Sequence, residues 1–262
     1  MATRKILGHP TWVKIPRRGR RAVILLHGAM SSSASLLRTL GPGLEKRFNV
    51  GAFDRRGHGR TADSAAAFTY EAMADETIAF IESLDRRVHV VGHSDGGNVA
   101  LLVAQRRPDL IRRMVVVGAN YHYDGLVDFA LLDPGTPDFD QWALKYAQLA
   151  PEGIAHAAEV LAKTNEMLRS GPTMTEADLR EITVPVLVMA GDDDVSTLAH
   201  TVSLFEALGE AQLAIVPGAS HAVLKERTKD CVRMITRFLG QRLPVETMSP
   251  LRRAPAGEYP GE

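Results

Sequence analysis

Short runs of apolar residues recur along this chain and alternate with longer segments of helical periodicity. Residues 22–26, 88–91 and 186–189 are clear examples. Apart from His89, each run is apolar throughout instead of alternating with polar residues, which indicates strands buried on both faces, as in a parallel sheet covered by helices. Because strands and helices alternate, we expect an α/β fold with a mostly parallel twisted sheet and helices on both of its faces.

This alternation predicts most of the secondary structure. The expected strands are residues 22–26, 48–53, 88–91, 114–117, 186–189 and 212–216, and the expected helices are residues 33–47, 70–84, 98–106, 197–208 and 222–239. The first helix contains Gly41-Pro42-Gly43, where we expect it to break or bend.

One long segment interrupts the alternation. Residues 118–184 contain no convincing strand, but they hold apolar residues at helical spacing. The segment is too long for an ordinary connection, so we expect a helical cap inserted at residues 121–180. The α/β core then comprises residues 1–120 and 181–240. Residues 241–262 carry many prolines and glycines and are expected to form a loosely ordered tail.

Charge and composition narrow the classes of partner. Lys plus Arg and Asp plus Glu both count 31, so the balance indicates neither nucleic acid nor an acidic membrane surface as a partner. No apolar run approaches the ~20 residues of a membrane span, and the N-terminus lacks the apolar core of a secretory signal, so we expect a cytoplasmic protein. The single cysteine, Cys231, rules out an internal disulfide and is typical of a core position.

The stretch Gly92-His93-Ser94-Asp95-Gly96 stands between a predicted strand and a predicted helix. It matches G-x-S-x-G, in which a sharp turn projects the serine hydroxyl above the sheet. Side chains two residues to either side of the serine would collide, so both positions need glycine. Asp95 does not fit as the nucleophile, because His93 would then take a position that requires glycine. We therefore predict that Ser94 is the nucleophile.

A second loop, His27-Gly28-Ala29-Met30, follows the strand at residues 22–26. A tetrahedral intermediate needs backbone N–H donors aimed at its oxyanion. In the G-x-S-x-G architecture one donor is the residue after the nucleophile, here Asp95, and the other comes from a loop after an earlier strand, here Ala29. Asp95 then contributes its backbone N–H, which leaves its side chain free to be polar. The side chain of His27 is expected to be structural.

Two later strand ends carry acids and a histidine. Gly191-Asp192-Asp193-Asp194 follows the strand at residues 186–189, and Pro217-Gly218-Ala219-Ser220-His221 follows the last strand. A serine hydroxyl becomes a good nucleophile when a base removes its proton, and that base needs a carboxylate to orient it. His221 is the predicted base, and any of the three aspartates could orient it. The order Ser, Asp, His is the one that this architecture uses.

These motifs together resemble those of the α/β-hydrolase superfamily. The resemblance covers residues 23–239 through LLHGAM, FDRRGHGRT, VVGHSDGGNVAL, VLVMAGDDDV and VPGASHAV. It implies the α/β-hydrolase fold with a helical cap at residues 121–180. The family's G-x-x-D pattern implies that Asp194 is the acid, and its D-x-R-G-x-G loop, here residues 54–59, implies a structural role for His58.

Two features depart from the family pattern. The segment before Val23 is short, so we expect a leading antiparallel strand to be missing or abbreviated. Asp95 stands where many relatives have methionine or another apolar residue, which leaves the subfamily open.

The expected reaction is hydrolysis of a small, largely apolar carboxylic ester, lactone or thioester through an acyl-enzyme. In relatives, the junction between sheet and cap often lines the pocket, so Tyr121 and His122 are candidate substrate contacts. Trp142 is a third candidate, from the cap itself. Packing in the core or between core and cap is the alternative for each of them.

Other functions use the same residues. The alternatives are a C–C bond hydrolase or a cofactor-free perhydrolase with the same triad, and a non-catalytic small-molecule receptor on the same fold. The sequence contains no cluster of metal ligands, phosphate-binding loop or dinucleotide motif, so we expect neither a metal nor a cofactor. A small-molecule substrate is the expected partner, and association into a homo-oligomer is left open.

Overall fold

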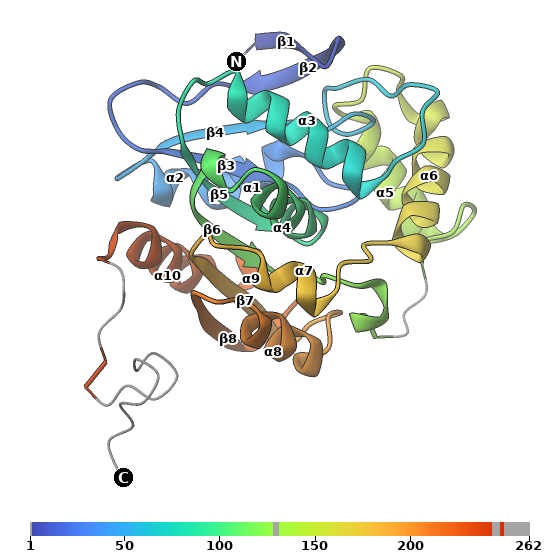
Figure 1. Cartoon of the computed structure of the whole chain (residues 1–262). Helices are drawn as coiled ribbons and strands as arrows, with labels where there is room; N and C mark the ends of the chain where they lie inside the picture. The colour runs from blue at the N-terminus through green and yellow to red at the C-terminus, as the bar shows by residue number, and fades with distance from the viewer. Residues whose placement is uncertain (1, 128–130, 243–246, 249–262) are drawn as a thin grey trace.

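The computed structural model describes residues 2–127, 131–242 and 247–248. At its centre is an eight-stranded sheet with the order β1-β2-β4-β3-β5-β6-β7-β8 (Figure 1). The strands are β1 (Ala2–Ile6), β2 (His9–Lys14), β3 (Ala22–Leu26), β4 (Asn49–Phe53), β5 (Val88–His93), β6 (Ile111–Val117), β7 (Val186–Asp193) and β8 (Ala211–Ser220). Neighbours from β4 to β8 are parallel, whereas β2 is antiparallel to β1 and β4. The predicted α/β class is confirmed, and most of the tail predicted at residues 241–262 lies outside the described residues.

Helices cover both faces of this sheet. They are α1 (Ser33–Thr39), α2 (Gly41–Leu44), α3 (Tyr70–Glu82), α4 (Asp95–Arg106), α7 (Glu176–Arg180), α8 (Leu198–Ala207), α9 (Val223–Glu226) and α10 (Thr228–Gly240). Alternate residues of β3 belong to opposite cores. Ile24 and Leu26 share a core with residues of α3, α4 and α8, while Val23 and Leu25 share one with residues of α1, α2 and α10. Burial on both faces explains why the central strands are apolar throughout.

The N-terminal hairpin corrects one expectation. A missing or abbreviated leading antiparallel strand is predicted from the sequence, and this prediction is wrong, because β1 and β2 form a hairpin and β2 pairs with β4. Leu7 and Gly8 turn the hairpin with φ values of 49° and 83°, both positive, as a tight two-residue turn of this kind requires. The hairpin lies at the edge of the sheet, and four of the five β1 residues are exposed. An exposed strand needs no apolar run, so the sequence gives no signal for it.

Several boundaries differ from those predicted. The helix expected at residues 33–47 breaks between α1 and α2 next to Pro42, as predicted, but α2 ends at Leu44. The helix expected at residues 222–239 is divided into α9 and α10 at Arg227, which was not predicted. The strands β7 and β8 run further than predicted, and Asp193 pairs with Ser220 at their ends. This extension brings the aspartate loop and the histidine loop together.

The segment between β6 and β7 contains the cap. Its helices are α5 (Pro137–Ala147) and α6 (Ala157–Ser170), with 3₁₀ turns η2 (Tyr123–Gly125) and η3 (Ile154–His156); a further 3₁₀ turn, η1 (Pro108–Leu110), precedes β6. In Figure 1, α5 and α6 lie at one side of the sheet, on the right. Although α7 falls within residues 121–180, it packs near α4 and α8, where Gln105 donates to Asp178 at 3.1 Å. It therefore belongs to the helical layer over the sheet.

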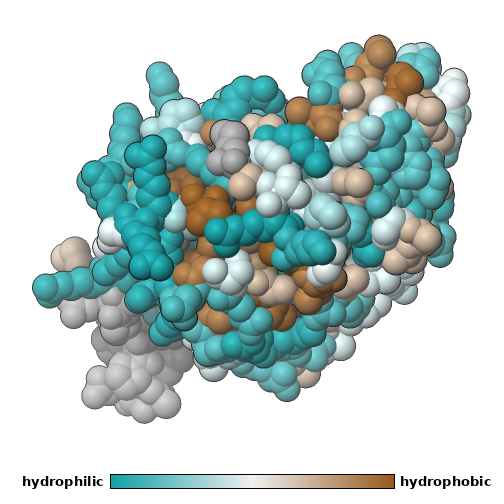
Figure 2. Space-filling view, turned by 90° about the horizontal axis from the view of Figure 1, so that it is seen from above, coloured by the Kyte–Doolittle hydropathy of each residue, from teal (hydrophilic) through white to brown (hydrophobic). Residues whose placement is uncertain are grey.

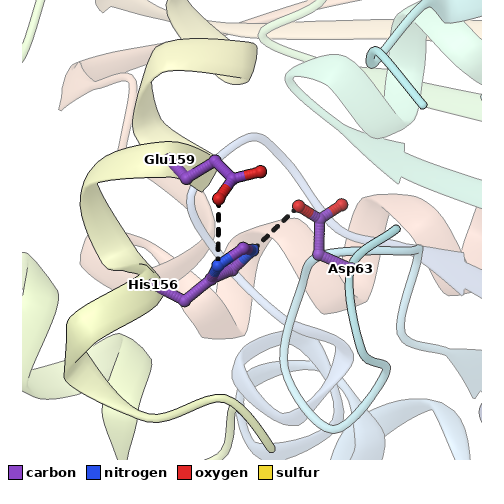
Figure 3. A group of neighbouring side chains, drawn as sticks. All are labelled: Asp63, His156 and Glu159. Atoms are coloured by element: carbon purple, nitrogen blue, oxygen red, sulfur yellow. Dashed lines mark hydrogen bonds and ion pairs between the residues drawn. The ribbon is translucent and has the colours of Figure 1, made fainter. Parts of the chain in front are cut away.

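A polar cluster joins α6 to the loop after β4 (Figure 3). Asp63 accepts hydrogen bonds from His156 Nε2 at 2.9 Å and from Lys163 Nζ at 2.6 Å. Asp63, His156 and Glu159 lie close enough together to hold a metal ion. However, the Lys163 ammonium also lies 3.3 Å from Glu159, so a cation already sits between the two carboxylates. We interpret the cluster as an ionic tie between cap and core.

The outer surface is mostly polar. In the view from above, hydrophilic side chains predominate and apolar ones gather in patches between them (Figure 2). Exposed large apolar side chains of the cap include Leu144, Leu149 and Ile154. In the described part of the chain, no helix is long and apolar enough to cross a membrane.

A buried histidine makes the fold sensitive to acid. His89 on β5 is 1% exposed, and burial, with smaller contributions from nearby arginines, lowers its pKa to about 3. Because the pKa of an unfolded histidine is about 6.5, its stabilising effect is complete above that pH and is lost as the pH falls toward 3. We expect His89 to account for about 2 kcal/mol of the loss in unfolding free energy between pH 7.5 and pH 5, measured by urea denaturation of the wild type and His89→Leu. His89→Leu should show a shallower pH dependence, and an unchanged slope would contradict this explanation.

Candidate active site

Ser94 occupies a strained corner between β5 and α4. Its backbone has φ 55° and ψ −127°, a conformation that a residue other than glycine rarely adopts. Its N–H donates to the Val117 carbonyl at 2.8 Å, which ties the corner to the end of β6. A Cβ at Gly92 would lie 2.2 Å from the Gly96 carbonyl oxygen, and one at Gly96 would lie 2.1 Å from the Leu26 carbonyl oxygen. Both positions therefore require glycine. At Gly92 the clash is within the motif, as predicted, whereas at Gly96 it is with the end of β3.

His221 and Asp194 form a close pair beside this corner. His221 Nδ1 lies 2.6 Å from Asp194 Oδ1, and the Asp194 side chain is fully buried. Burial by itself raises the pKa of Asp194, but the hydrogen bond and charge of His221 outweigh this effect and leave the pKa below its usual value. The imidazole side chain remains 30% exposed, so its other face is open to a ligand.

The other two aspartates of the loop lie elsewhere. Asp192 Oδ1 accepts a hydrogen bond from the Ala219 N–H at 3.0 Å, and Asp193 is an exposed residue at the end of β7. The residues alone left the three aspartates open and the family resemblance implied Asp194, and Asp194 is the one that lies against the histidine.

Gly118 makes room for this pair, a role that the sequence analysis missed. It follows β6 with φ 58°, and a Cβ there would lie 3.0 Å from His221 Nδ1 and 3.1 Å from Asp194 Oδ2. A glycine directly after an apolar strand was the available signal, but its meaning depends on residues about 75 and 100 positions away in the chain.

His93 is a second residue that the sequence analysis missed. Its Nε2 lies 2.9 Å from the His221 carbonyl oxygen, and the two rings lie 5.0 Å apart. Burial, followed by the charge of His221, lowers the pKa of His93 to about 4, so the ring is neutral near pH 7. A neutral ring with its proton on Nε2 donates a hydrogen bond to this carbonyl. The bond holds the backbone of the loop that carries His221.

The predicted oxyanion donors lie next to the nucleophile. Ala29 and Asp95 line one cavity together with Ser94 and His221. A Cβ at Gly28 would lie 3.0 Å from Ser94 Cβ, so the backbone of this loop passes close to the serine. This arrangement can place two backbone N–H groups near a carbonyl oxygen bound at Ser94.

The nearby buried polar side chains have structural partners. His27 is fully buried between the Gly28 carbonyl at 2.8 Å and the Arg55 N–H at 3.2 Å. Burial, then the charge of Arg55, holds the pKa of His27 well below its usual value. The Asp95 carboxyl is 2% exposed and accepts the Tyr70 hydroxyl at 2.8 Å, while burial raises its pKa. The Asp95 side chain therefore has a buried hydroxyl partner, Tyr70, which the sequence did not indicate.

Two cavities meet at Ser94, the predicted nucleophile. The first, which we call the leucine cavity, has a volume of about 520 Å³ and is lined by Leu126, Leu131, Leu132 and Leu168 beside Ser94 and His221. The second, which we call the lysine cavity, has a volume of about 430 Å³ and also contacts Ser94 and His221, with Lys225 in its wall. A bound ester can therefore extend to both sides of the serine.

The three predicted substrate contacts lie in different places. Trp142 lines the lysine cavity, and its Nε1–H donates to the Met30 carbonyl at 2.9 Å. Tyr121 and His122 line neither of the two cavities. The Tyr121 ring stacks on His200 at 4.0 Å, which holds it against α8. Asn120, one residue earlier, lines the leucine cavity in their place.

The chain is similar in sequence to known hydrolases. A model of the alpha/beta hydrolase family matches residues 23–234. The chain is 31% identical over 227 residues to the putative carbamate hydrolase RutD of Caulobacter sp. (strain K31), covering 77% of this chain and 84% of that protein. It is 26% identical over 239 residues to the serine hydrolase BPHL of Mus musculus, covering 84% and 80%.

Solved structures share the fold. The meta-cleavage product hydrolase CumD of Pseudomonas fluorescens IP01, in a mutant form complexed with acetates, superposes with a TM-score of 0.72 and 21% sequence identity, covering 91% of this chain and 97% of that one. At this level of identity the similarity concerns the fold alone.

Proposed function

Because the chain belongs to the alpha/beta hydrolase family, we propose that it is a serine hydrolase that cleaves small carboxylic esters through an acyl-enzyme. The observation that carries the proposal is the 2.6 Å contact between Asp194 and His221 beside the strained Ser94 corner. Lactones and thioesters present the same acyl group to such a site. The proposed partner is accordingly a small-molecule substrate.

In the proposed mechanism, His221 accepts the proton of Ser94 Oγ as this oxygen attacks the ester carbonyl carbon. Asp194 keeps the imidazole proton on Nδ1 and stabilises the imidazolium that forms. The N–H groups of Ala29 and Asp95 stabilise the oxyanion. His221 then protonates the departing alcohol. A water molecule, deprotonated by the same histidine, hydrolyses the acyl-enzyme and restores Ser94.

The leucine cavity favours particular acyl groups. Its leucines provide an apolar wall, in agreement with the small, largely apolar substrate expected from the sequence. The lining also contains Asp95, Asp133 and Asp138, and it contains no lysine or arginine among the described residues. An acyl group that carries a carboxylate would meet like charge there. We propose neutral or amine-bearing acyl groups for this cavity.

Covalent labelling tests the proposed chemistry. We expect a fluorophosphonate probe to add once to the protein, with peptide mapping locating the adduct on Ser94, because the proposed base, His221, lines the same cavities as this serine. 4-Nitrophenyl acetate should be turned over many times per enzyme molecule. Protein unfolded in urea before labelling serves as the control for intrinsic serine reactivity. Absence of an adduct would overturn the proposal, and one acylation without further turnover would favour the receptor alternative.

A further inference from the structure

The lysine cavity is not a simple extension of the leucine cavity. Its wall contains hydroxyl groups from Ser31, Ser35 and Thr39 and the ammonium group of Lys225. It continues into a further hollow of about 340 Å³, which shares Ser31, Ser35, Trp142 and Lys225 with it and adds Arg38 and Lys145. The whole passage runs outward from Ser94 along the cap helix α5.

The two sides of the nucleophile differ in charge. Among the described residues, the lysine cavity and its outer hollow are lined by three cationic side chains and by no aspartate or glutamate. The described residues that line the leucine cavity include three aspartates and no lysine or arginine. The cationic groups are available to a ligand, since in the described part of the chain Lys225 and Arg38 have no ion-pair partner and Lys145 Nζ contacts an amide, that of Gln141, at 3.0 Å.

Both cavities contact His221, but the placement of the rest of the histidine loop favours one orientation of a bound ester. Ser220, Ala222 and Leu224 wall the lysine cavity, so this cavity lies against the loop that carries His221. The leaving group must receive its proton from His221 as it departs. A leaving group in the lysine cavity meets this requirement, and the acyl group then occupies the leucine cavity.

From these observations we propose that the lysine cavity is a binding site for an anionic leaving group, such as an alcohol or phenol that bears a carboxylate, sulfate or phosphate. This inference rests on the proposed serine hydrolase function and adds the substrate class to it. Lys225 is the cation next to the reacting centre, and Arg38 and Lys145 extend the positive potential outward. In the reaction, the ester C–O bond breaks, the leaving oxygen takes the proton of His221, and the anionic group keeps its charge throughout.

The experiment compares matched acetate esters. The anionic ester is 4-acetoxybenzoate and the neutral one is methyl 4-acetoxybenzoate. We expect Lys225→Met to lower the ratio of their kcat/KM values by roughly 3- to 10-fold, mainly through KM of the anionic ester, because one partly solvated cation is lost. The ratio in the wild type should also fall with added salt. Lys229→Met is the control, since Lys229 lies on α10, outside both cavities, and the ratio should be unchanged.

A second pair of esters tests the orientation. Phenyl hydrogen succinate carries its charge on the acyl side, where three aspartates lie, so it should be cleaved more slowly than phenyl methyl succinate. Equal ratios in the wild type and Lys225→Met would overturn the inference while cleavage of the neutral acetate ester upholds the hydrolase function. A preference for the acyl-side anion would overturn it as well.

Binding of the product 4-hydroxybenzoate tests the anion site independently of the proposed hydrolase function. Calorimetric titration with 4-hydroxybenzoate and with its methyl ester requires no turnover. If no ester is cleaved, weaker binding of 4-hydroxybenzoate to Lys225→Met than to the wild type would still support the anion site. Equal binding would overturn it.

Discussion

The variant Ser94→Ala should lose roughly 10⁴- to 10⁶-fold in kcat/KM for 4-nitrophenyl acetate, because it removes the atom that forms the acyl-enzyme. The proposed oxyanion donors and both cavities remain, so weak binding of the ester should persist. The comparison is made by steady-state kinetics, with the burst of nitrophenol recorded in the wild type. Loss of the burst together with the turnover would locate the defect in acylation.

The loss should not come from misfolding. Alanine retains the Cβ of serine, so it places the same group at the φ of 55°, and the neighbouring glycines keep their contacts. Melting temperatures of Ser94→Ala and the wild type should therefore be similar. Ser170→Ala, at the exposed end of α6, is the matched control and should retain wild-type activity. A Ser94→Ala variant that keeps more than a few per cent of the activity would refute the mechanism.

The second large effect distinguishes the three adjacent aspartates. Asp194→Asn should lower kcat by roughly 10³- to 10⁴-fold, because an amide can donate to His221 and stabilise the wrong tautomer, and it cannot offset the charge of the imidazolium. Asp193→Asn, at an exposed position next in sequence, should change kcat by less than about twofold. Steady-state kinetics on purified variants, with melting temperatures as a check on folding, provides the comparison.

The difference in kcat between Asp194→Asn and Asp193→Asn decides which aspartate is the acid that pairs with His221. Asp194 is buried and lies 2.6 Å from His221, whereas Asp193 is exposed and pairs with Ser220 through the backbone of the strand ends. Asp192→Ala removes the acceptor of the Ala219 N–H, so it should weaken the loop without abolishing catalysis. Equal losses in Asp194→Asn and Asp193→Asn would mean that the acid assignment is incorrect.

The features that the sequence predicts well are those encoded within a few neighbouring residues. The apolar runs of β3, β5 and β7 predict a doubly covered parallel sheet, because burial on both faces leaves no polar alternation. The corner at Ser94 is recognisable because its steric demand falls on Gly92 and Gly96, two residues away on either side. Elements at the edge of the sheet lack such a pattern. The β1–β2 hairpin was not predicted because four of the five β1 residues are exposed, so β1 has no apolar run.

The sequence by itself therefore determined the α/β class, the nucleophile corner and the order of the candidate catalytic residues. Only the tertiary structure shows the contact between Asp194 and His221, which the family resemblance implied, the close approach of Gly118 and His93 to His221, and the stacking of Tyr121 on His200. It also decided the opposite charges of the two cavities. These properties depend on side chains brought together from distant segments, as in the contact between residues 93 and 221, and no local pattern of sterics or hydrophobicity encodes them.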